Sequence, residues 1–572
     1  MSLYDKSSLV LIPSGTKTGK VYSQVPVSGD GDFTFTRSSA ATRVNADGNI
    51  EKETQNLLLQ SNSFNTWISN NTSETSGQSG YDGTNDAWLL AKSAASAYMY
   101  VNNTVSGVQT FSIYAKSGSL SWMRIVILGA VDFADAFFNL ADGSLGANSG
   151  LISGSSESIT GGWYRYSLTI NGSHSQVRIY PADFNGNVSG TSGNILIQDA
   201  QREQGLVARD YIETTTSAVE GGITDNVPRL DYTDSSCPAL LLEPQRTNLL
   251  PQSEYIGAWI KANTTTEDNV VTSPEGVVNA TRIIENYVNA SHQIYDDFSA
   301  TSGQVYTLSF FAKKNGRDIG VGMASGIFGS NSTYFDLTNG VVISTTSEDA
   351  SIEDYGDGWF RCSVTNTANS SGNPFVYILL SNNANFVYTG DGTSGVYIYG
   401  IQVEAGSYAT SYIPTYGSSV TRTQDKGSIP SASSLIGQTE GTLFVKFKHT
   451  NEAIGLVGIN AGNIGNRLYI GTDTNGLISQ VRVSYSTQAF FATPLTIGTT
   501  YKCALAYKEN DFVLYVNGNQ IGVDTNGLVP SSLSRIAFQQ ANDNDPMPQP
   551  LSEVLVFKTR LSNEELADLT TL

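Results

Sequence analysis

Charged side chains are scarce in this sequence. Asp, Glu, Lys and Arg make up 15% of its 572 residues, against about 25% in an average soluble domain. Long stretches of Lys, Glu, Ala and Leu are nearly absent, whereas Gly, Ser, Thr, Asn, Tyr and Phe are abundant. This composition excludes a mainly helical protein and favours strands joined by turns. The 40% of hydrophobic residues can build packed cores, so we expect an all-β protein of three or four domains.

Basic runs and long apolar runs are also missing. The formal net charge is −20, and such a surface repels nucleic acids and anionic membranes, so we expect neither as a partner. No stretch is apolar enough to cross a bilayer or to act as a signal peptide, including the N-terminal MSLYDKSSLVLIPSG. We therefore expect a protein made in a cytoplasm without a standard export signal.

Cysteine and histidine are too few for a disulfide framework or a metal cluster. The three cysteines, Cys237, Cys362 and Cys503, are far apart and odd in number, so we expect buried free thiols. The three histidines are equally scattered, at positions 174, 292 and 449. A Ser-His-Asp triad or a histidine-rich metal site is poorly supported by this pattern, and we expect no catalytic residues.

What the sequence does contain is an internal duplication. Residues 56–67 (NLLLQSNSFNTW) resemble residues 248–259 (NLLPQSEYIGAW). Four more pairs follow in the same order: TFSIYAK with TLSFFAK, FFNLADG with YFDLTNG, GGWYRYSLT with DGWFRCSVT, and AQREQG with IQVEAG. Five matching blocks in one order indicate two copies of one domain, at 55–218 and 247–420.

The repeated blocks read as strands of an antiparallel sandwich. In TFSIYAK, the apolar residues Phe111, Ile113 and Ala115 alternate with Thr110, Ser112 and Lys116. Alternation with a period of two places one set in a core and the other in solvent. Leu308, Phe310 and Ala312 repeat this pattern in the second copy.

The segment 438–572 differs from the two repeats. Leu443, Val445 and Phe447 alternate along one predicted strand, and Asn517-Gly518 is typical of a type I′ hairpin turn. Ser562 and Glu565 fit a capping box that opens one short helix. Outside these units we expect a small N-terminal β module at 1–54, a connecting element at 219–246 and a linker at 421–437.

Several segments resemble known families. The pair FTFTRSSAATRVNADG (33–48) and VPRLDYTDSSCPALLLEPQRTNLL (227–250) closely resembles segments of structural proteins of tailed bacteriophages. The repeats look like the jelly-roll, carbohydrate-binding-module-like domains of those proteins. YKCALAYKENDFVLYVNG and LSEVLVFKTRLSNEEL resemble laminin G-like, or concanavalin A-like, domains. The implied fold is two tandem jelly rolls, a C-terminal concanavalin A/laminin G-like sandwich and the N-terminal module.

The order of these segments departs from that family. The two phage-like segments often lie close together in such proteins, whereas here the first repeat separates them. We therefore expect 1–54 and 219–246 to pack against each other, with the first jelly roll inserted as an outward-facing module.

Candidate ligand contacts follow from comparing the two repeats. Trp67/Trp259 and Trp163/Trp359 occur in both copies, so we assign them to the scaffold. Aromatic residues without a counterpart are better candidates for stacking on a sugar, because a flat apolar ring with a polar edge suits a pyranose. The candidates are Trp88, Trp122, Tyr287, Phe386 and Tyr388.

Acidic turns supply candidate metal ligands, although no cofactor is required by the sequence. Asp82, Asp86 and Asp391 lie in Asp- and Gly-rich turns that could hold structural Ca²⁺ through oxygen ligands. The alternative is that these residues simply satisfy turn geometry. Glycosidases of the concanavalin A-like class carry an E-x-D-x-x-E strand, but Leu514 replaces its second glutamate after Glu509 and Asp511.

The resemblance implies a virion surface protein, either a tail fibre or adhesin or a head fibre, that binds host-surface glycans and has no enzymatic activity. Its expected partners are other virion proteins, contacted through the N-terminal module, and copies of itself, a trimer being common among phage fibres. Its expected location is the virion surface. Two alternatives stay open: a decoration or assembly protein without a glycan ligand, and a carbohydrate-active enzyme.

Overall fold

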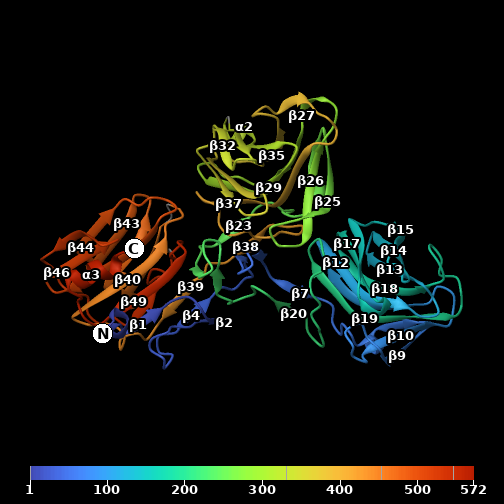
Figure 1. The fold of residues 1–572 in the computed structure, drawn as a ribbon, viewed down its shortest axis with the longest axis horizontal. Coiled ribbons are helices and arrows are strands. Elements are labelled where there is room, and N and C mark those ends of the chain that lie inside the picture. Colours follow the sequence, from blue (N-terminus) through green and yellow to red (C-terminus); the bar gives the residue numbers. More distant parts are fainter. Residues whose placement is uncertain (1, 330, 452–453, 545) are drawn as a thin grey trace.

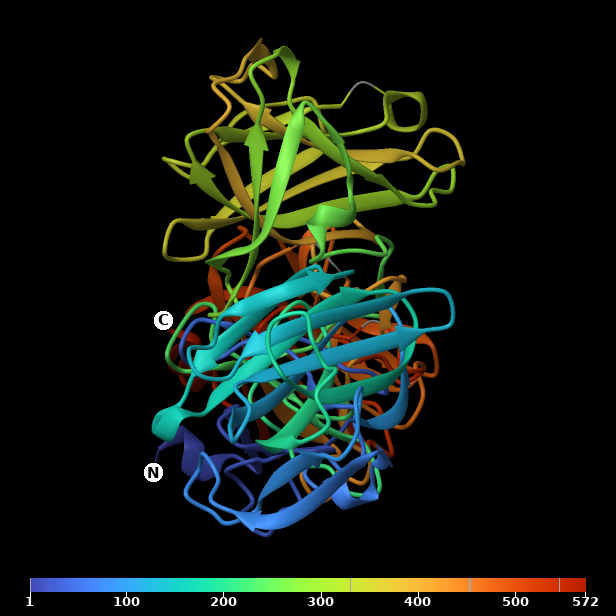
Figure 2. The same cartoon turned by 90° about the vertical axis from the view of Figure 1, so that its right-hand side faces the viewer.

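The computed structural model describes residues 2–329, 331–451, 454–544 and 546–572. About 52% of the chain is strand and 4% is helix, which confirms the all-β class. The strands form three lobes that meet at a central junction (Figure 1). In the perpendicular view the second lobe stands above the other two (Figure 2). Among the helices that the structure describes, none has the length and apolar character needed to cross a membrane.

The first lobe is a sandwich of two six-stranded antiparallel sheets, β16-β17-β12-β19-β10-β9 and β15-β14-β13-β18-β11-β8. Phe111 and Ile113 of one sheet and Ile125 and Ile179 of the other are fully buried between them. The strands are β8 (Ile68–Asn70), β9 (Thr72–Gln78), β10 (Ala87–Lys92), β11 (Tyr98–Val105), β12 (Val108–Ser117), β13 (Trp122–Gly129), β14 (Phe133–Asn139), β15 (Leu145–Ser149), β16 (Ser153–Ser158), β17 (Tyr164–Asn171), β18 (His174–Ala182) and β19 (Gly193–Gln204).

The second lobe repeats this topology with the orders β33-β34-β29-β37-β26-β25 and β32-β31-β30-β35-β28-β24. The predicted duplication therefore extends to the strand order of both sheets. The strands are β24 (Ile260–Ala262), β25 (Thr264–Thr272), β26 (Val278–Glu285), β28 (Gln293–Asp297), β29 (Val305–Asn315), β30 (Asp318–Met323), β31 (Thr333–Asp336), β32 (Val341–Thr345), β33 (Asp349–Asp354), β34 (Trp359–Thr367), β35 (Phe375–Ser381) and β37 (Gly395–Ala405). This copy adds the pair β27 (Asn289–Ser291) and β36 (Val387–Thr389) and the short helix α2 (Ser325–Phe328).

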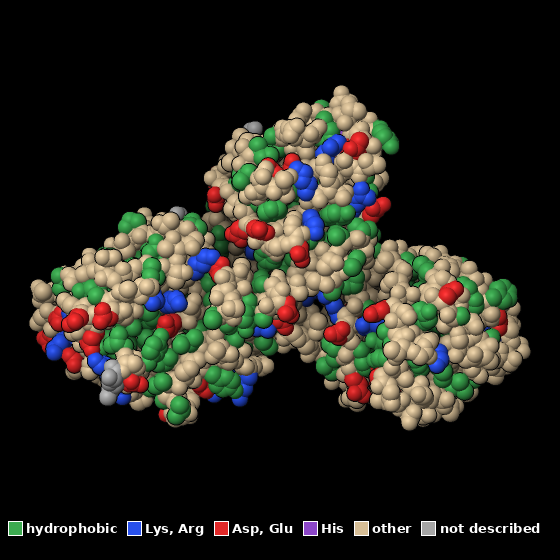
Figure 3. Space-filling model, in the orientation of Figure 1, with side chains coloured by type: hydrophobic (Ala, Val, Ile, Leu, Met, Phe, Trp, Pro, Cys, Tyr) green, Lys and Arg blue, Asp and Glu red, His purple; other side chains and the backbone are tan. Residues whose placement is uncertain are grey.

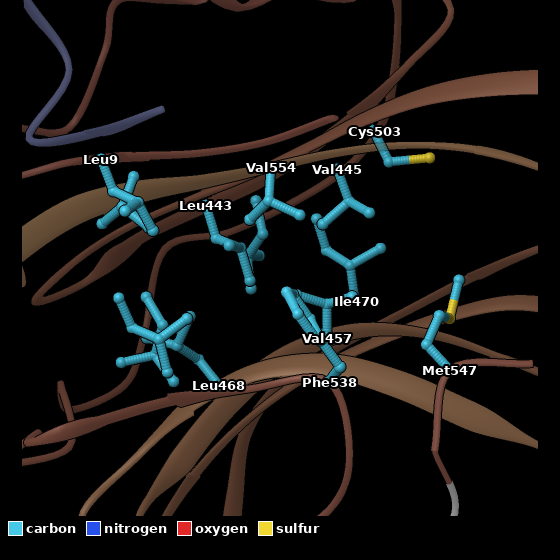
Figure 4. Close-up of a cluster of buried hydrophobic side chains, with 14 of the residues drawn as sticks. Leu9, Leu443, Val445, Val457, Leu468, Ile470, Cys503, Phe538, Met547 and Val554 are labelled. Carbon is cyan, nitrogen blue, oxygen red and sulfur yellow. The ribbon is translucent and has the colours of Figure 1, made fainter. Parts of the chain in front are cut away.

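The third lobe packs an eight-stranded sheet on a nine-stranded sheet. Leu443 and Val445 from one sheet point toward Leu468 and Ile470 from the other (Figure 4). The C-terminal strands are β39 (Lys426–Ile429), β40 (Glu440–Lys448), β41 (Gly455–Asn460), β42 (Arg467–Asp473), β43 (Gly476–Val483), β44 (Ser486–Thr493), β45 (Thr500–Lys508), β46 (Asp511–Val516), β47 (Asn519–Asp524), β48 (Arg535–Ala537) and β49 (Leu551–Phe557).

Residues 1–54 do not form a module of their own, which corrects the expected boundaries. β1 (Leu9–Leu11) pairs with β49, and β2 (Thr16–Lys17), β3 (Lys20–Val21) and β4 (Phe33–Thr36) extend the other sheet through β39. The connecting element supplies β21 (Arg229–Asp231) and β22 (Ala239–Leu241), and β22 also pairs with β49. The expected linker 421–437 contains β39 itself. Non-local strand pairing thus makes these segments part of the third lobe.

The segments 1–54 and 219–246 lie side by side at the junction. β7 (Thr54–Asn56) pairs with β20 (Val219–Gly221). Their loops are also joined by backbone hydrogen bonds, with the Ala41 amide donating to the Ile223 carbonyl at 3.0 Å. The junction is completed by the hairpin of β5 (Arg43–Val44) and β6 (Ile50–Glu51) and by β23 (Arg246–Asn248), which pairs with β38 (Val420–Arg422). The first lobe is therefore an insertion between two paired segments.

A buried ionic cluster ties the junction together; we call it the central cluster. It consists of Arg37, Arg229, Arg422, Glu243 and Asp425. Arg229 pairs with Asp425 and, at 2.6 Å, with Glu243, while Arg422 reaches Glu243 at 2.7 Å. Burial alone would raise the pKa of Glu243, but the charges of Arg422 and Arg229 outweigh it and hold that pKa well below its usual range. Residues of the two phage-like segments therefore meet in one buried network.

Several local predictions are confirmed and one is wrong. Ser562 and Glu565 form both bonds of the capping box that opens α3 (Asn563–Thr570), whereas the N-terminal helix α1 (Leu3–Lys6) was not predicted. Asn517 and Gly518 have the positive φ values of a type I′ turn, +46° and +79°. Cys362 and Cys503 are buried free thiols, but Cys237 is exposed because it lies in the loop between β21 and β22.

Candidate functional site

Each repeat lobe has one covered sheet and one open sheet. In the first lobe, Tyr81 and Tyr211 pack on Tyr114 of β12 and on Trp163, which directly precedes β17. The sheet that contains β12 and β17 is therefore the covered one. In the second lobe, Ile50 of β6 is buried in the cluster of Phe311 on β29 and Tyr399 on β37. The other sheet of each lobe lies farther from the junction (Figure 1). The solvent-facing surface of that sheet is called the outward face.

The outward face of the first lobe is set by strand alternation. Met99, Ile125 and Ile179 point into the core, so the residues between them point away from it. Direct cross-strand partners place these side chains in rows. One row runs Tyr98, Tyr180, Arg124 and Phe137, and the next runs Tyr100, Arg178, Val126 and Asp135.

The side chains of this face form a continuous contact ladder. The rings of Tyr98 and Tyr180 have centroids 4.9 Å apart. The Arg124 guanidinium lies 5.4 Å from the Tyr180 ring and 5.3 Å from the Phe137 ring, and Arg178 lies 4.7 Å from Tyr98. Stacked guanidinium and aromatic groups hold each other in place. Of these groups, Tyr98, Tyr100 and Arg178 are partly exposed, whereas Tyr180 and Phe137 are buried.

The outward face of the second lobe carries a related set of rings, some at positions equivalent to those of the first lobe and some at other positions. Tyr295 of β28 lies opposite Tyr377 of β35, with ring centroids 5.5 Å apart, and Phe375 packs edge-on to Tyr295 at 5.1 Å. Across the sheet, Tyr334 of β31 stacks with Phe386 at 6.2 Å. Between these two groups β30 presents Gly320 and Gly322, opposite Leu379 and Tyr377. The Tyr334 ring packs over Gly320.

Two of the five predicted ligand residues lie on these faces. Trp122 is half-buried at the start of β13 and points to the same side as Arg124. Phe386 is 38% exposed and stacks on Tyr334. Their role as ligand contacts stays a prediction.

The other three predicted ligand residues are placed elsewhere. Trp88 packs against the core of the first lobe, and its indole N–H donates to the Asn62 carbonyl at 3.0 Å. Tyr388 is buried and donates its hydroxyl to Glu285 at 2.7 Å. Both rings are therefore used in packing, which corrects their assignment as exposed platforms. Tyr287 is 73% exposed, but it lies beside Gly392 and away from the outward face.

The predicted calcium ligands are held by turn hydrogen bonds. Asp82 accepts bonds from Thr84, and the amide of Gln198 bridges Asp82 and Asp86. Asp391 accepts from Thr393 and Ser394, and these bonds hold its pKa well below the usual range. Within the residues that the structure describes, no group of three or more His, Cys, Asp or Glu side chains is placed to hold a metal. A calcium site at these turns stays a prediction.

A separate cavity of about 570 Å³ opens on the third lobe. Its walls include Lys446 and Lys448 of β40, Glu553 of β49 and the loop that carries Asp234. Lys448 pairs with Asp234, and Glu553 accepts the Tyr4 hydroxyl at 2.6 Å. The described residues that line this cavity include no aromatic side chain, so it lacks a surface for stacking.

The sequence contained a signal for the rings that the prediction missed. In Tyr98-Met99-Tyr100 and in Phe375-Val376-Tyr377, aromatic residues flank a single aliphatic one. Because side chains alternate along a strand, this pattern places two rings on the face opposite the core. The comparison of repeats missed part of it, since Tyr100 and Tyr295 occupy equivalent positions, opposite Arg178 and Tyr377, and shared residues were assigned to the scaffold.

Comparisons with known proteins report only distant likenesses. No family model matches the chain, and no curated protein does. One similar solved structure is a Bacteroides ovatus protein to which carbohydrate binding is ascribed, with 10% identity, 50% of this chain and 80% of that chain covered, and a TM-score of 0.16. Another is the LG1–3 region of the laminin alpha2 chain, with 12% identity, coverage of 81% and 95%, and a TM-score of 0.17.

A third similar solved structure is an enzyme, which corrects the expectation that the chain has no enzymatic activity. Trypanosoma rangeli sialidase, a glycoside hydrolase, is among the similar structures, with 9% identity, coverage of 98% and 96%, and a TM-score of 0.22. At such TM-scores, none of the three likenesses assigns an activity or a ligand. All that they share with this chain is a fold built from β-sheets.

Proposed function

We propose that the chain binds glycans through the outward faces of its first and second lobes. The observation that carries this proposal is the pair of partly exposed aromatic surfaces, Tyr98 and Tyr100 on one lobe and Tyr295, Phe375 and Tyr377 on the other. Rings that lie on an open sheet present apolar faces to the C–H groups of a sugar. Asn102 and Gln176 at the edge of the first face supply polar partners for its hydroxyls.

Two sites on one chain compensate for weak binding at each. A shallow site of millimolar affinity contributes only about 4 kcal/mol. Linking two such sites on one ligand can raise avidity by roughly 10²–10⁴ without new contacts. Further copies in an oligomer would multiply the effect. The duplication of the lobe is consistent with this use.

The test uses the full-length chain on a glycan array, followed by calorimetry with the best oligosaccharide. The double variant Tyr98→Ala/Tyr377→Ala should lower the affinity at least about tenfold, equivalent to about 1.4 kcal/mol, because each change removes a central ring. Phe490→Ala is the matched control, since Phe490 is 54% exposed on β44 of the third lobe. Equal binding by the double variant and the control would refute the proposal.

The second part of the proposal places the chain on the surface of a tailed-phage virion, as a fibre or adhesin. Support comes from the resemblance of segments 33–48 and 227–250 to phage structural proteins, because Arg37, Arg229 and Glu243 of those segments build the central cluster. Other virion proteins, copies of this chain and a host-surface glycan are the proposed partners. Gold-labelled antibody against the chain should decorate purified particles, and particles without label would contradict this location.

A further inference from the structure

Arg178 points outward from β18 of the first lobe. Its neighbours hold its guanidinium in place, but they do not neutralise its charge. Its guanidinium lies over the Tyr98 ring at 4.7 Å. Its Nε donates to Gln176 at 2.5 Å, and Gln176 in turn donates to Asn102 at 2.9 Å. The ring and the hydrogen bond together fix the plane of the guanidinium. The two terminal nitrogens are the part left for another partner.

Arg124, on the same face, shows the contrast. Its Nε and Nη2 both bond Asp135, at 2.9 and 2.6 Å, and Asp135 also accepts the Ser149 hydroxyl. Arg124 is therefore a neutralised pair. For Arg178, the described part of the chain places no carboxylate within ion-pair distance and no acceptor on its terminal nitrogens.

We infer that the outward face of the first lobe selects sugars that carry a carboxylate, and that the second lobe takes neutral sugars. This inference rests on the proposed glycan binding. A guanidinium offers two parallel N–H groups that match the two oxygens of a carboxylate. Tyr98 and Tyr100, which flank Arg178, supply the adjoining surface for the ring of the same sugar.

The second lobe lacks any counterpart of this charge. By sheet register Tyr377 stands where the first lobe has Arg178, since each lies opposite a tyrosine, Tyr295 and Tyr100. Gly320, opposite Leu379 and Tyr334, takes the place of Arg124, opposite Tyr180 and Phe137. The rows of this outward face, all on described strands, hold no Lys or Arg. The duplicated lobes have therefore diverged in charge, although each has aromatic rings on its outward face.

The net charge of the chain sharpens this inference. At −20, the surface as a whole disfavours anions, and charged side chains of both signs are scattered over the face shown in Figure 3. Attraction of an acidic sugar would then come from a local group. Removing the Arg178 guanidinium should therefore abolish the preference for carboxylate-bearing sugars over neutral ones.

The experiment titrates the full-length chain with three probes: a galacturonate trimer, its carboxyl-reduced neutral form and a sulfated galactose oligosaccharide. Arg178→Gln should weaken binding of the galacturonate trimer at least tenfold and leave binding of the neutral form within twofold. Arg178→Lys should restore less than half of the change in log Kd caused by Arg178→Gln, because an ammonium cannot donate two parallel hydrogen bonds to a carboxylate. Arg282→Gln, which removes an arginine from β26 of the second lobe, is the matched control.

The outcomes separate the inference from the proposal beneath it. Binding of the neutral form without any preference for galacturonate, or equal galacturonate binding by Arg178→Gln and the control, overturns the inference and leaves glycan binding in place. Tighter binding of the sulfated probe than of galacturonate overturns the carboxylate assignment. Binding of none of the probes overturns the inference as well. Binding of the neutral form reports that the second lobe is folded in each variant, and wild-type hydrogen exchange in β11 and β18 reports the same for the first lobe, which carries Arg178.

Discussion

Arg229 is fully buried where the lobes meet, and it pairs with both Glu243 and Asp425. Asp425 pairs with both Arg229 and Arg37, so removing Asp425 leaves three buried guanidinium groups around Glu243, and breaking a buried ion pair in this way costs about 3–5 kcal/mol. We expect Asp425→Asn to lower the free energy of unfolding by that amount, measured by calorimetry of the full chain. Arg43→Met is the control, because the Arg43–Glu51 pair is partly exposed and should contribute under about 1 kcal/mol. Equal effects of the two changes would show that the central cluster is dispensable.

Glu53 gives a prediction about pH. Burial, with Glu220 and Asp225 nearby, raises the pKa of Glu53 from 4.5 to about 7. A carboxyl whose folded pKa exceeds its unfolded pKa loses stabilisation as pH rises from 4.5 to 7. We therefore expect Glu53→Gln to raise the unfolding temperature at pH 8 and to have little effect at pH 4.5. Glu157→Gln on exposed β16 should change neither value. A gain of the same size at both pH values would contradict this assignment.

At the level of single residues, the sequence revealed part of the candidate site. Trp122 and Phe386 were found because they have no counterpart in the other repeat. Trp88 met the same criterion but is used in packing. Arg178 could not be found, since its importance depends on the absence of a carboxylate neighbour in three dimensions. Sequence identifies a residue type, whereas pairing depends on which strands become neighbours.

At the level of elements, one buried amide recurs in both repeats. The side chain of Asn56 donates to the carbonyls of Ala200 and Ile212 and accepts from two backbone amides. Asn248 makes the same bonds to Ile401 and Ile413 in the second lobe. Each asparagine thus anchors the first segment of its lobe to the last strand and to the segment that follows it.

We expect Asn56→Ala to loosen the first lobe alone. Leaving buried backbone groups without partners costs about 1–3 kcal/mol for each group. Hydrogen exchange measured by mass spectrometry should quicken in β19 and in 205–215, while the second lobe keeps the wild-type rate. Asn248→Ala should give the mirror image, with faster exchange in β37 and 406–416. Faster exchange in both lobes after either change would show that the lobes do not open independently.

Strands within each repeat were predictable because their pairing is local and their pattern alternates. The sandwich around β12 and β29 follows from the apolar residues that the sequence shows at every second position. The strands β1 and β22 were missed as parts of the third lobe. Their partner β49 lies hundreds of residues away, and a strand of three residues carries too short a pattern to identify the sheet it will join.

At the level of the whole molecule, the first two lobes are joined through charged groups. Lys52 of the junction reaches Glu254 at 2.8 Å and Glu275 at 2.7 Å, and Arg209 of the first lobe pairs with Glu275. Backbone contacts add to this, with the Val108 amide donating to the Tyr416 carbonyl at 2.8 Å. Burial alone would raise the pKa of Glu275, but the charges of Lys52 and Arg209 outweigh it and hold that pKa well below its usual range. These bonds join the first two lobes at the junction.

Lys52→Met should therefore let the first two lobes move relative to each other. The change leaves Glu254 and Glu275 buried with one cation fewer, and a charge in that position costs about 3–5 kcal/mol. Small-angle X-ray scattering should show a larger radius of gyration, and binding of a glycan long enough to span both faces should weaken while binding of a short one stays unchanged. Lys314→Met, which breaks a partly exposed pair with Asp318, is the control. If Lys52→Met keeps the wild-type radius and the same affinity for the long glycan, the lobes are held by their backbone contacts and the ionic junction does not set their angle.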